Sequence, residues 1–157
     1  MSDRNIRRLA TGGVLAGAIF LLTAFVRVPL AAGYLNFGDV GVFLAALLLP
    51  AGYAALAAGV GSALADLYGF PLYAPVTLAV KGIAALVFAL LWRRLKGPLR
   101  YLAFLSVLIV PLGYFLFEIV VYAEFAWADL PLNLLQSAVG AALALLLDRA
   151  TKGRFSV

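Results

Sequence analysis

The sequence predicts an all-α fold: a polytopic membrane protein in which one domain, residues 1–157, forms a bundle of six transmembrane helices. Its composition supports this prediction, because the chain is 66% hydrophobic and only 12% charged. A soluble domain is about half apolar and about a quarter charged. The mean hydropathy is +1.08. A soluble core of this size could not bury so much apolar surface, so lipid must be the solvent for much of the chain.

The positions of the basic residues predict the orientation. Ten of the twelve Lys and Arg residues lie in three clusters, which are Arg4, Arg7 and Arg8; Arg93, Arg94, Lys96 and Arg100; and Arg149, Lys152 and Arg154. Basic clusters mark the cytoplasmic ends of membrane helices, because positively charged loops resist translocation. Six spans place all three clusters on one side, so both termini are expected in the cytoplasm. We therefore expect a multi-pass protein of the cell membrane.

The first three apolar runs are residues 9–28, 39–50 and 53–67. The first has the length of about 20 apolar residues that a spanning helix needs. It resembles a signal peptide, but it is long for one and further spans follow, which favours a retained helix. Residues 29–38 are expected to be a loop. The turn signal at residues 50–52 predicts a tight hairpin of two short helices. If both were re-entrant, four helices would span the membrane with the same charge pattern.

The last three apolar runs are residues 74–95, 101–123 and 132–148. A basic loop separates the first two of them, which agrees with a cytoplasmic connection. Residues 124–131 are acidic and contain a proline, and they are expected to form a short outer loop.

Several classes of function are excluded or disfavoured by what the sequence lacks. The net charge of +5 is explained by basic clusters beside the membrane, which favour anionic lipids, so we expect no nucleic acid partner. The chain has no Cys and no His, which removes the commonest metal ligand and the commonest general base. No phosphate-binding G-x-x-x-x-G-K-[ST] motif occurs. We therefore expect no enzyme activity, no metal and no cofactor.

Three charged residues interrupt the apolar runs near their predicted outer ends. Lys81 lies ~10 Å below the outer end of its run, at about 1.5 Å per residue. Glu118 lies in the outer half of the next run, and Asp66 ends the third. A charge at the bilayer centre costs roughly 2.5–3.5 kcal/mol, and such residues are usually functional. We expect a buried, partly paired cluster that contacts a ligand; the alternative is that Lys81 pairs with an acid only to hold helices together.

Other polar residues near the outer end are candidates for the same site. Asn133 and Gln136 lie three residues apart on one helix face, and their amides suit the edge of a flat heterocycle, although helix–helix hydrogen bonding is an equal alternative. Asn36 and Asp39 close the first outer loop, where Asp39 is also well placed to cap a helix. Aromatic residues crowd this level as an interfacial belt, and a few of them are expected to stack on a ligand, among them Tyr73 and Tyr122.

Small residues recur four positions apart in the first run, where Gly12 precedes Ala16 and Gly13 precedes Gly17. Such spacing lets helices approach closely. The face that these residues form either packs inside the bundle or contacts a partner protein.

The order of the polar motifs carries a resemblance. From Tyr34 to about Leu147 the chain resembles the substrate-binding subunit (S component) of energy-coupling factor (ECF) vitamin transporters, in the riboflavin-transporter-like branch. The motifs that carry the resemblance are N-x-G-D, G-S-A-L-A-D, Y-A-P-x-T-x-x-x-K-G and P-x-N-L-L-Q. It implies six helices, with both termini inside and a ligand pocket near the outer face beneath the loop between the first two helices. The pocket candidates that it implies are Asn36, Asp39, Lys81, Glu118, Asn133 and Gln136.

The resemblance also implies partners. A small-residue face on the first helix would dock onto a transmembrane coupling subunit, which is itself bound to two cytoplasmic ATPase subunits. Members of the family typically show Ala-x-x-x-Ala at this face, whereas this chain has Gly12, Gly13, Ala16 and Gly17 there. The identity of the vitamin does not carry over, because pocket residues differ between members.

The resulting hypothesis is a non-catalytic subunit of an ATP-driven importer that captures a small vitamin or heterocyclic precursor at the outer face. The first alternative is a stand-alone secondary transporter in which Lys81 and nearby acids relay protons. A membrane enzyme that acts on lipid or peptide would depend on Glu118. A membrane assembly factor without a small ligand is the remaining alternative.

Overall fold

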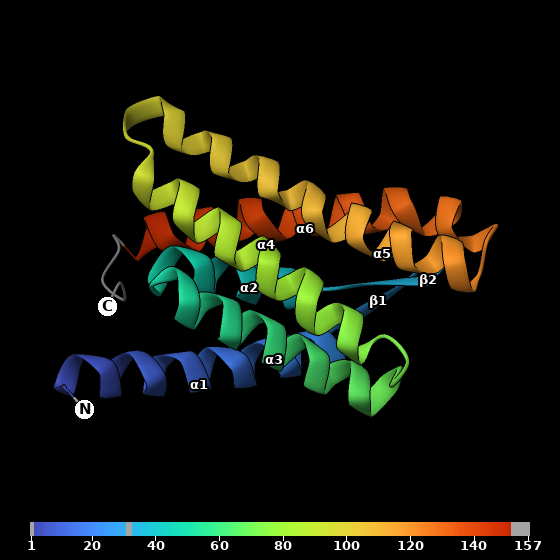
Figure 1. Cartoon of the computed structure of the whole chain (residues 1–157), viewed down its shortest axis with the longest axis horizontal. Coiled ribbons are helices and arrows are strands. Elements are labelled where there is room, and N and C mark those ends of the chain that lie inside the picture. The colour runs from blue at the N-terminus through green and yellow to red at the C-terminus, as the bar shows by residue number, and fades with distance from the viewer. Residues whose placement is uncertain (1, 31–32, 152–157) are drawn as a thin grey trace.

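The computed structural model of the chain describes residues 2–30 and 33–151. Helices dominate this part of the chain, as the sequence predicts (Figure 1). The elements in order are α1 (Asp3–Phe25), β1 (Arg27–Leu30), β2 (Gly33–Asn36), α2 (Gly38–Leu48), α3 (Ala51–Gly69), α4 (Ala74–Arg94), the 3-10 helix η1 (Gly97–Leu108), α5 (Ile109–Val121) and α6 (Phe125–Ala150).

Four helical segments of the described chain are long and apolar enough to cross a membrane. They are α1, α4, the continuous stretch of η1 and α5, and α6. The second run forms α2, which has only 11 residues and would rise about 16 Å at 1.5 Å per residue. This is about half of the ~30 Å hydrocarbon core. The prediction of a helical multi-pass protein is therefore confirmed, while six complete crossings stay a prediction.

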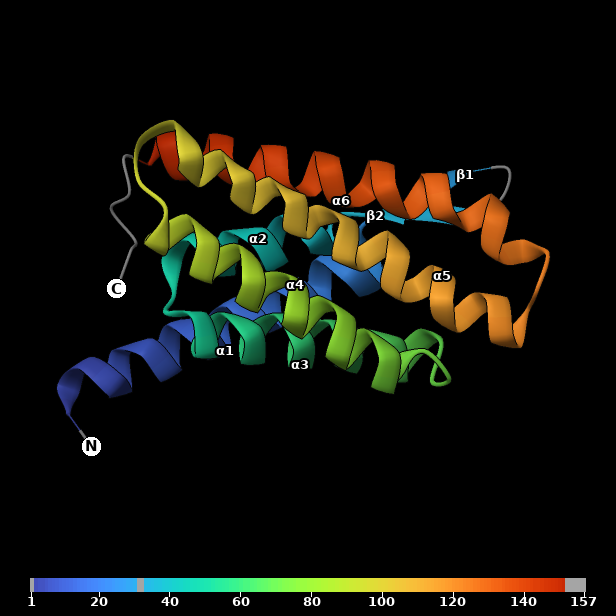
Figure 2. The same cartoon turned by 45° about the horizontal axis from the view of Figure 1, so that its top comes forward.

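The short helix α2 lies inside the bundle (Figures 1 and 2). It contacts α1, α3, α4 and α6, and nine of its 11 residues are buried. A helix that is apolar on all sides belongs in a protein interior, and the G-V-F-L-A-A-L-L sequence of α2 has this character. Its centre is Phe43, which is fully buried and packs against Phe88 of α4 with ring centroids 5.3 Å apart.

A glycine allows α1 to approach α3 closely. A Cβ at Gly61 would lie 2.5 Å from the backbone oxygen of Ala16 and 3.0 Å from its Cα. Only a residue without a side chain fits there, so Gly61 and Ala16 form a small-residue contact of the kind that membrane helices use.

Two predicted loops are wrong. The segment expected as a loop at residues 29–38 contains most of an antiparallel hairpin, in which Arg27 pairs with Asn36 and Leu30 with Gly33. Strand pairing satisfies backbone groups that would otherwise lack partners near the bilayer. The acidic loop expected at residues 124–131 is helical, because α6 begins at Phe125 and continues through Pro131. A proline removes one helix hydrogen bond, and membrane helices tolerate that loss when neighbouring groups compensate for it.

The helix ends also differ from the expected runs. α1 begins at Asp3 and ends at Phe25, rather than covering residues 9–28. The fifth run starts as the 3-10 helix η1 at Gly97 and becomes α-helical at Ile109. The hairpin and the α3–α4 and α5–α6 connections gather at one end of the bundle, and the start of α1 and the end of α6 lie toward the other (Figure 1).

Candidate functional site

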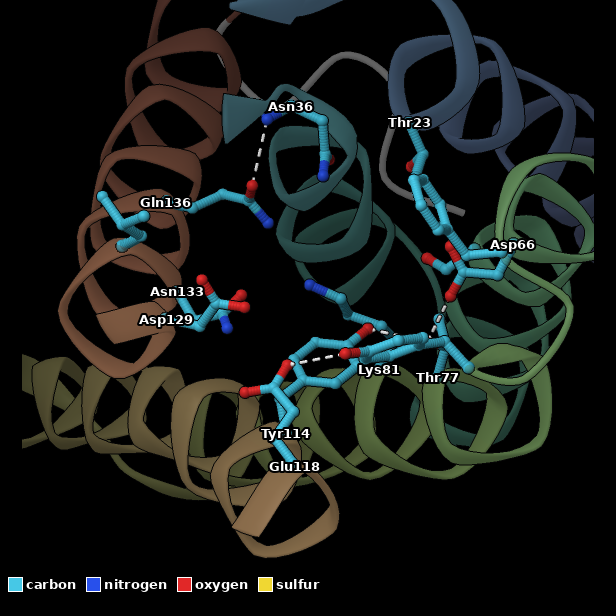
Figure 3. A pocket seen from close by; sticks show the side chains of 14 residues that line it. Thr23, Asn36, Asp66, Thr77, Lys81, Tyr114, Glu118, Asp129, Asn133 and Gln136 are labelled. Atoms are coloured by element: carbon cyan, nitrogen blue, oxygen red, sulfur yellow. Dashed lines mark hydrogen bonds between the residues drawn. The ribbon is translucent and has the colours of Figure 1, made fainter. Parts of the chain in front are cut away.

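A cavity of about 210 Å³ lies between the end of α3, the start of α4, the end of α5 and the start of α6. Figure 1 places these helix ends at the end of the bundle that carries the hairpin. It joins Lys81, Glu118 and Asn133, which come from three different helices. Figure 3 shows these side chains around one space, with Gln136 further along α6. The cavity is lined by Thr23, Asn36, Ser62, Asp66, Phe70, Tyr73, Thr77, Lys81, Tyr114, Glu118, Asp129, Leu132, Asn133 and Gln136.

Lys81 is held by an acid outside the cavity lining. Its ammonium forms a buried ion pair with Oδ1 of Asp39 on α2. The second oxygen of Asp39 accepts hydrogen bonds from Oγ of Ser137 at 2.7 Å and from Nε2 of Gln136 at 3.5 Å. The Lys81 ammonium also lies 5.3 Å from the ring centroid of Tyr114, within cation–π range. The positive charge of Lys81 is thus largely balanced within the protein.

Asp39 therefore pairs with Lys81 and does not cap a helix, which was the alternative role expected for it. α2 begins at Gly38, and the N-cap position before it is held by Phe37, which makes no side-chain cap hydrogen bond. Asp39 lies within the first turn and points toward Lys81 and α6. Gly140 of α6 makes room for this arrangement, because a Cβ there would lie 2.6 Å from the Cβ of Asp39.

Gln136 ties the hairpin to the bundle. Its Oε1 accepts a hydrogen bond of 3.0 Å from the backbone N–H of Asn36, while its Nε2 reaches Asp39. The side chain of Asn36 accepts a hydrogen bond from the backbone N–H of Gly38 at 2.9 Å, which shapes the entry to α2. Helix–helix hydrogen bonding, the alternative considered for the amide pair, thus describes Gln136. The side chain of Asn133, by contrast, faces the cavity and makes no hydrogen bond to the described part of the chain.

The acids expected to share Lys81 have other neighbours. Asp66 accepts a hydrogen bond from Oγ1 of Thr77, which also shares one of 2.8 Å with the hydroxyl of Tyr114. Glu118 accepts a hydrogen bond of 3.3 Å from the hydroxyl of Tyr73. Burial raises the pKa of the Tyr73 hydroxyl, and the negative charge of Glu118 raises it further. The three charged residues that were expected to form a cluster therefore line one cavity, but the ion pair of Lys81 is with Asp39 and not with Asp66 or Glu118.

The sequence matches a known family over almost its whole length. A family model described as "ECF-type riboflavin transporter, S component" covers residues 3–152. The chain belongs to this S component family. It is also 44% identical over 72 residues to a protein of Pyrococcus woesei described as "Uncharacterized protein in gap 3'region". That match covers 45% of this chain and 49% of the relative, so the chain spans about half the length of the curated relative that it matches.

Most residues expected at the ligand site of this S component lie at the cavity, but two do not. Asp39 lies behind Lys81, outside the lining. Tyr122 follows the last turn of α5 and stacks on Tyr73, with ring centroids 6.3 Å apart and an interplanar angle of 17°. It therefore touches the site through Tyr73 and not directly.

Several lining residues of the S component were missed by the sequence analysis. Their positions could have indicated them, because each lies one helical turn before a predicted site residue and on the same helix face. Thr77 precedes Lys81 in this way, Tyr114 precedes Glu118, and Asp129 precedes Asn133. Asp129 was also hidden by the wrong assignment of residues 124–131 to a loop.

The small residues of α1 divide between two faces. Gly12 and Ala16 face the bundle, where Gly12 approaches Leu49 and Ala16 packs under Gly61. Gly13 and Gly17 are exposed, and a Cβ at either position would meet no atom within 4 Å among the described residues. Of the two pairs considered for partner contact, Gly13 and Gly17 form the open one.

Proposed function

We propose that this chain is the membrane-embedded substrate-binding subunit of an ATP-driven ECF importer. It captures a small vitamin or heterocyclic precursor at the outer face and delivers it inward, and it catalyses no reaction. The observation that carries the proposal is the polar cavity at one end of an otherwise apolar bundle. Ionisable residues within a membrane helix cost roughly 2.5–3.5 kcal/mol each on insertion scales, and binding of a polar ligand gives a reason to retain them.

The charge distribution supports an outward-facing cavity. The basic clusters at Arg4–Arg8 and Arg93–Arg100 lie toward the end of the bundle opposite the hairpin. Basic ends face the cytoplasm, so the cavity opens toward the outside of the cell membrane and both termini lie inside. A transmembrane coupling subunit with two ATPase subunits would then drive release to the inside, and the exposed Gly13 and Gly17 offer a face for docking.

We assign the residues of the site by their position at the cavity. Lys81, Glu118 and Asn133 contact the ligand, together with Tyr73. Asn36 and Gln136 form the wall beneath the hairpin, and they hold it in place through their hydrogen bond. Asp39 positions Lys81, and Tyr122 positions Tyr73 by stacking.

Ligand binding to the purified chain tests the proposal. The chain in detergent is mixed with B-vitamins and their precursors, and melting and native mass spectra are recorded. A ligand at about 100 times its Kd stabilises the protein by about 2.7 kcal/mol, which shifts the melting temperature by several degrees at this size. No shift and no bound mass with any compound would contradict the proposal. Uptake by the chain alone, driven by an ion gradient in proteoliposomes, would favour the secondary transporter with a proton relay instead.

A further inference from the structure

The cavity contains an acid that lacks a full set of partners. Glu118 is only 3% exposed, and its Oε1 accepts one hydrogen bond, from Tyr73. Its Oε2 is buried and has no hydrogen-bond partner in the described part of the chain. A buried polar atom without a partner carries its full desolvation cost. Glu118 lines the cavity, so a hydrogen-bond donor on a ligand bound there would satisfy this atom.

A second acid lies on the same side of the cavity. Asp129 lies one turn before Asn133 on α6, and both line the cavity. Figure 3 shows Asp129 and Asn133 close to each other, with Glu118 reaching in from α5. Besides burial and the neighbouring Tyr122, the negative charges of Glu118 and Asp129 both raise the pKa of the Tyr73 hydroxyl. Both acids are thus within electrostatic reach of the same hydroxyl.

No cation within the described side chains balances these two acids. The ion pair formed by these described side chains is the one between Lys81 and Asp39, and Asp39 neutralises the charge of Lys81. Asp39 also accepts hydrogen bonds from Ser137 and Gln136, and Lys81 forms no ion pair with Glu118 or Asp129 among the described side chains. An anionic ligand would meet two uncompensated carboxylates, whereas a cationic ligand would neutralise them.

The aromatic residues and the volume narrow the ligand further. Phe70, Tyr73 and Tyr114 line the cavity, and aromatic faces attract organic cations and stack on flat rings. A cavity of about 210 Å³ lies below the roughly 300–1,000 Å³ typical of sites for drug-sized ligands. It has the size for one substituted ring.

We propose that the ligand is a single-ring heterocycle that carries a protonated amine, with the ammonium bound between Glu118 and Asp129. Oε2 of Glu118 accepts a hydrogen bond from the ammonium, and the amide of Asn133 binds the ring edge. This inference rests on the proposed importer function, because it names the substrate class of the same cavity.

Matched pairs of probes test the charge directly. Pyridoxamine and pyridoxine differ by an aminomethyl for a hydroxymethyl group on one ring, as do 4-amino-5-aminomethyl-2-methylpyrimidine and its 5-hydroxymethyl analogue. Binding to the purified chain is measured by calorimetry at pH 7, and riboflavin is included as a larger ligand without a protonated amine. We expect the aminomethyl member of at least one pair to bind at least tenfold more tightly than its partner.

Two variants locate the ammonium. Glu118→Gln should remove most of the preference for the aminomethyl probe over the hydroxymethyl probe, because it removes the carboxylate that binds the ammonium. Asp129→Asn should reduce the preference in the same direction. Glu124→Gln is the matched control, because Glu124 is exposed and lies outside the cavity lining, and it should leave the preference unchanged.

The outcomes separate this inference from the importer function. Equal or tighter binding of the hydroxymethyl probes, or binding of riboflavin alone, would overturn the cationic ligand and leave the importer function standing. A preference that survives Glu118→Gln and Asp129→Asn would also overturn it. If wild-type protein binds no probe and no compound of the vitamin panel, both proposals fail.

Discussion

Lys81 of α4, which lines the cavity, forms a buried ion pair with Asp39 of α2, which lies behind it and outside the lining. The two residues are 42 positions apart in the sequence, and their pair joins α4 to α2. Asp39 is connected in turn to α6 through Ser137 and Gln136. One carboxylate therefore links three helices, and it decides where the ammonium of Lys81 points.

Removing only Asp39 should destabilise the bundle strongly. Asp39→Asn leaves the charge of Lys81 buried without a counter-ion, and loss of one partner of a buried pair typically costs about 3–5 kcal/mol. The double variant Asp39→Asn with Lys81→Met removes the lone charge and should recover much of the lost stability. Chemical denaturation in detergent measures both values. Equal stability of the single and double variants would show that the pair is not coupled.

Variants of Lys81 and Asn133 should both lower the ligand affinity but should differ in their effect on the melting temperature. Asn133→Ala should lower the affinity for the ligand at least tenfold with little change in melting temperature, because its side chain has no hydrogen-bond partner within the described chain. Lys81→Ala should lower both, because it also leaves Asp39 uncompensated. Calorimetric titration and thermal melting of the same preparations provide the comparison. Unchanged affinity in both variants would remove these residues from the site.

Much of this architecture was readable from the sequence, and the exceptions have physical causes. Lys81 and Glu118 stood out because a charge inside an apolar run is costly. The partner of Lys81 could not be chosen, since Asp39, Asp66 and Glu118 all fall at the outer end and pairing depends on how helices cross. Asp129 falls in a segment that the sequence predicts to be a loop, because proline usually marks a helix boundary, whereas α6 continues through Pro131.

A methyl group at Gly140 should disturb the site through Asp39, which lies behind Lys81. A Cβ there would lie 2.6 Å from the Cβ of Asp39 and 2.9 Å from its backbone carbon, so Gly140→Ala must push α6 away from α2. Overpacking of this kind typically costs about 1–3 kcal/mol. Gly52→Ala is the control, because a Cβ at that position meets no atom within 4 Å among the described residues. Thermal melting should show a loss only for Gly140→Ala, and equal melting of both variants would contradict the close contact.

Arg93 should stabilise the bundle through the end of α2. Its guanidinium donates hydrogen bonds to the carbonyl oxygens of Ala46, Leu47 and Leu49. These are carbonyls that a helix end leaves without partners. Arg93→Met should cost roughly 1–3 kcal/mol for each buried carbonyl that loses its donor. Arg94→Met removes a neighbouring charge that makes no such hydrogen bond to the described residues, so it should change the unfolding free energy much less. A similar loss in both variants would indicate a general effect of charge.

The open face of α1 should matter for assembly and not for folding. Gly13 and Gly17 are exposed and have free space above them, so Gly17→Leu should melt like the wild type and bind ligand equally well. The proposed importer function requires a coupling subunit to approach closely, which small residues at such a face allow, so Gly17→Leu should abolish co-purification with the proposed coupling and ATPase subunits. Gly61→Leu is the reverse case, because its side chain would meet the backbone of Ala16 and should prevent folding. Normal assembly of Gly17→Leu would assign docking to another surface.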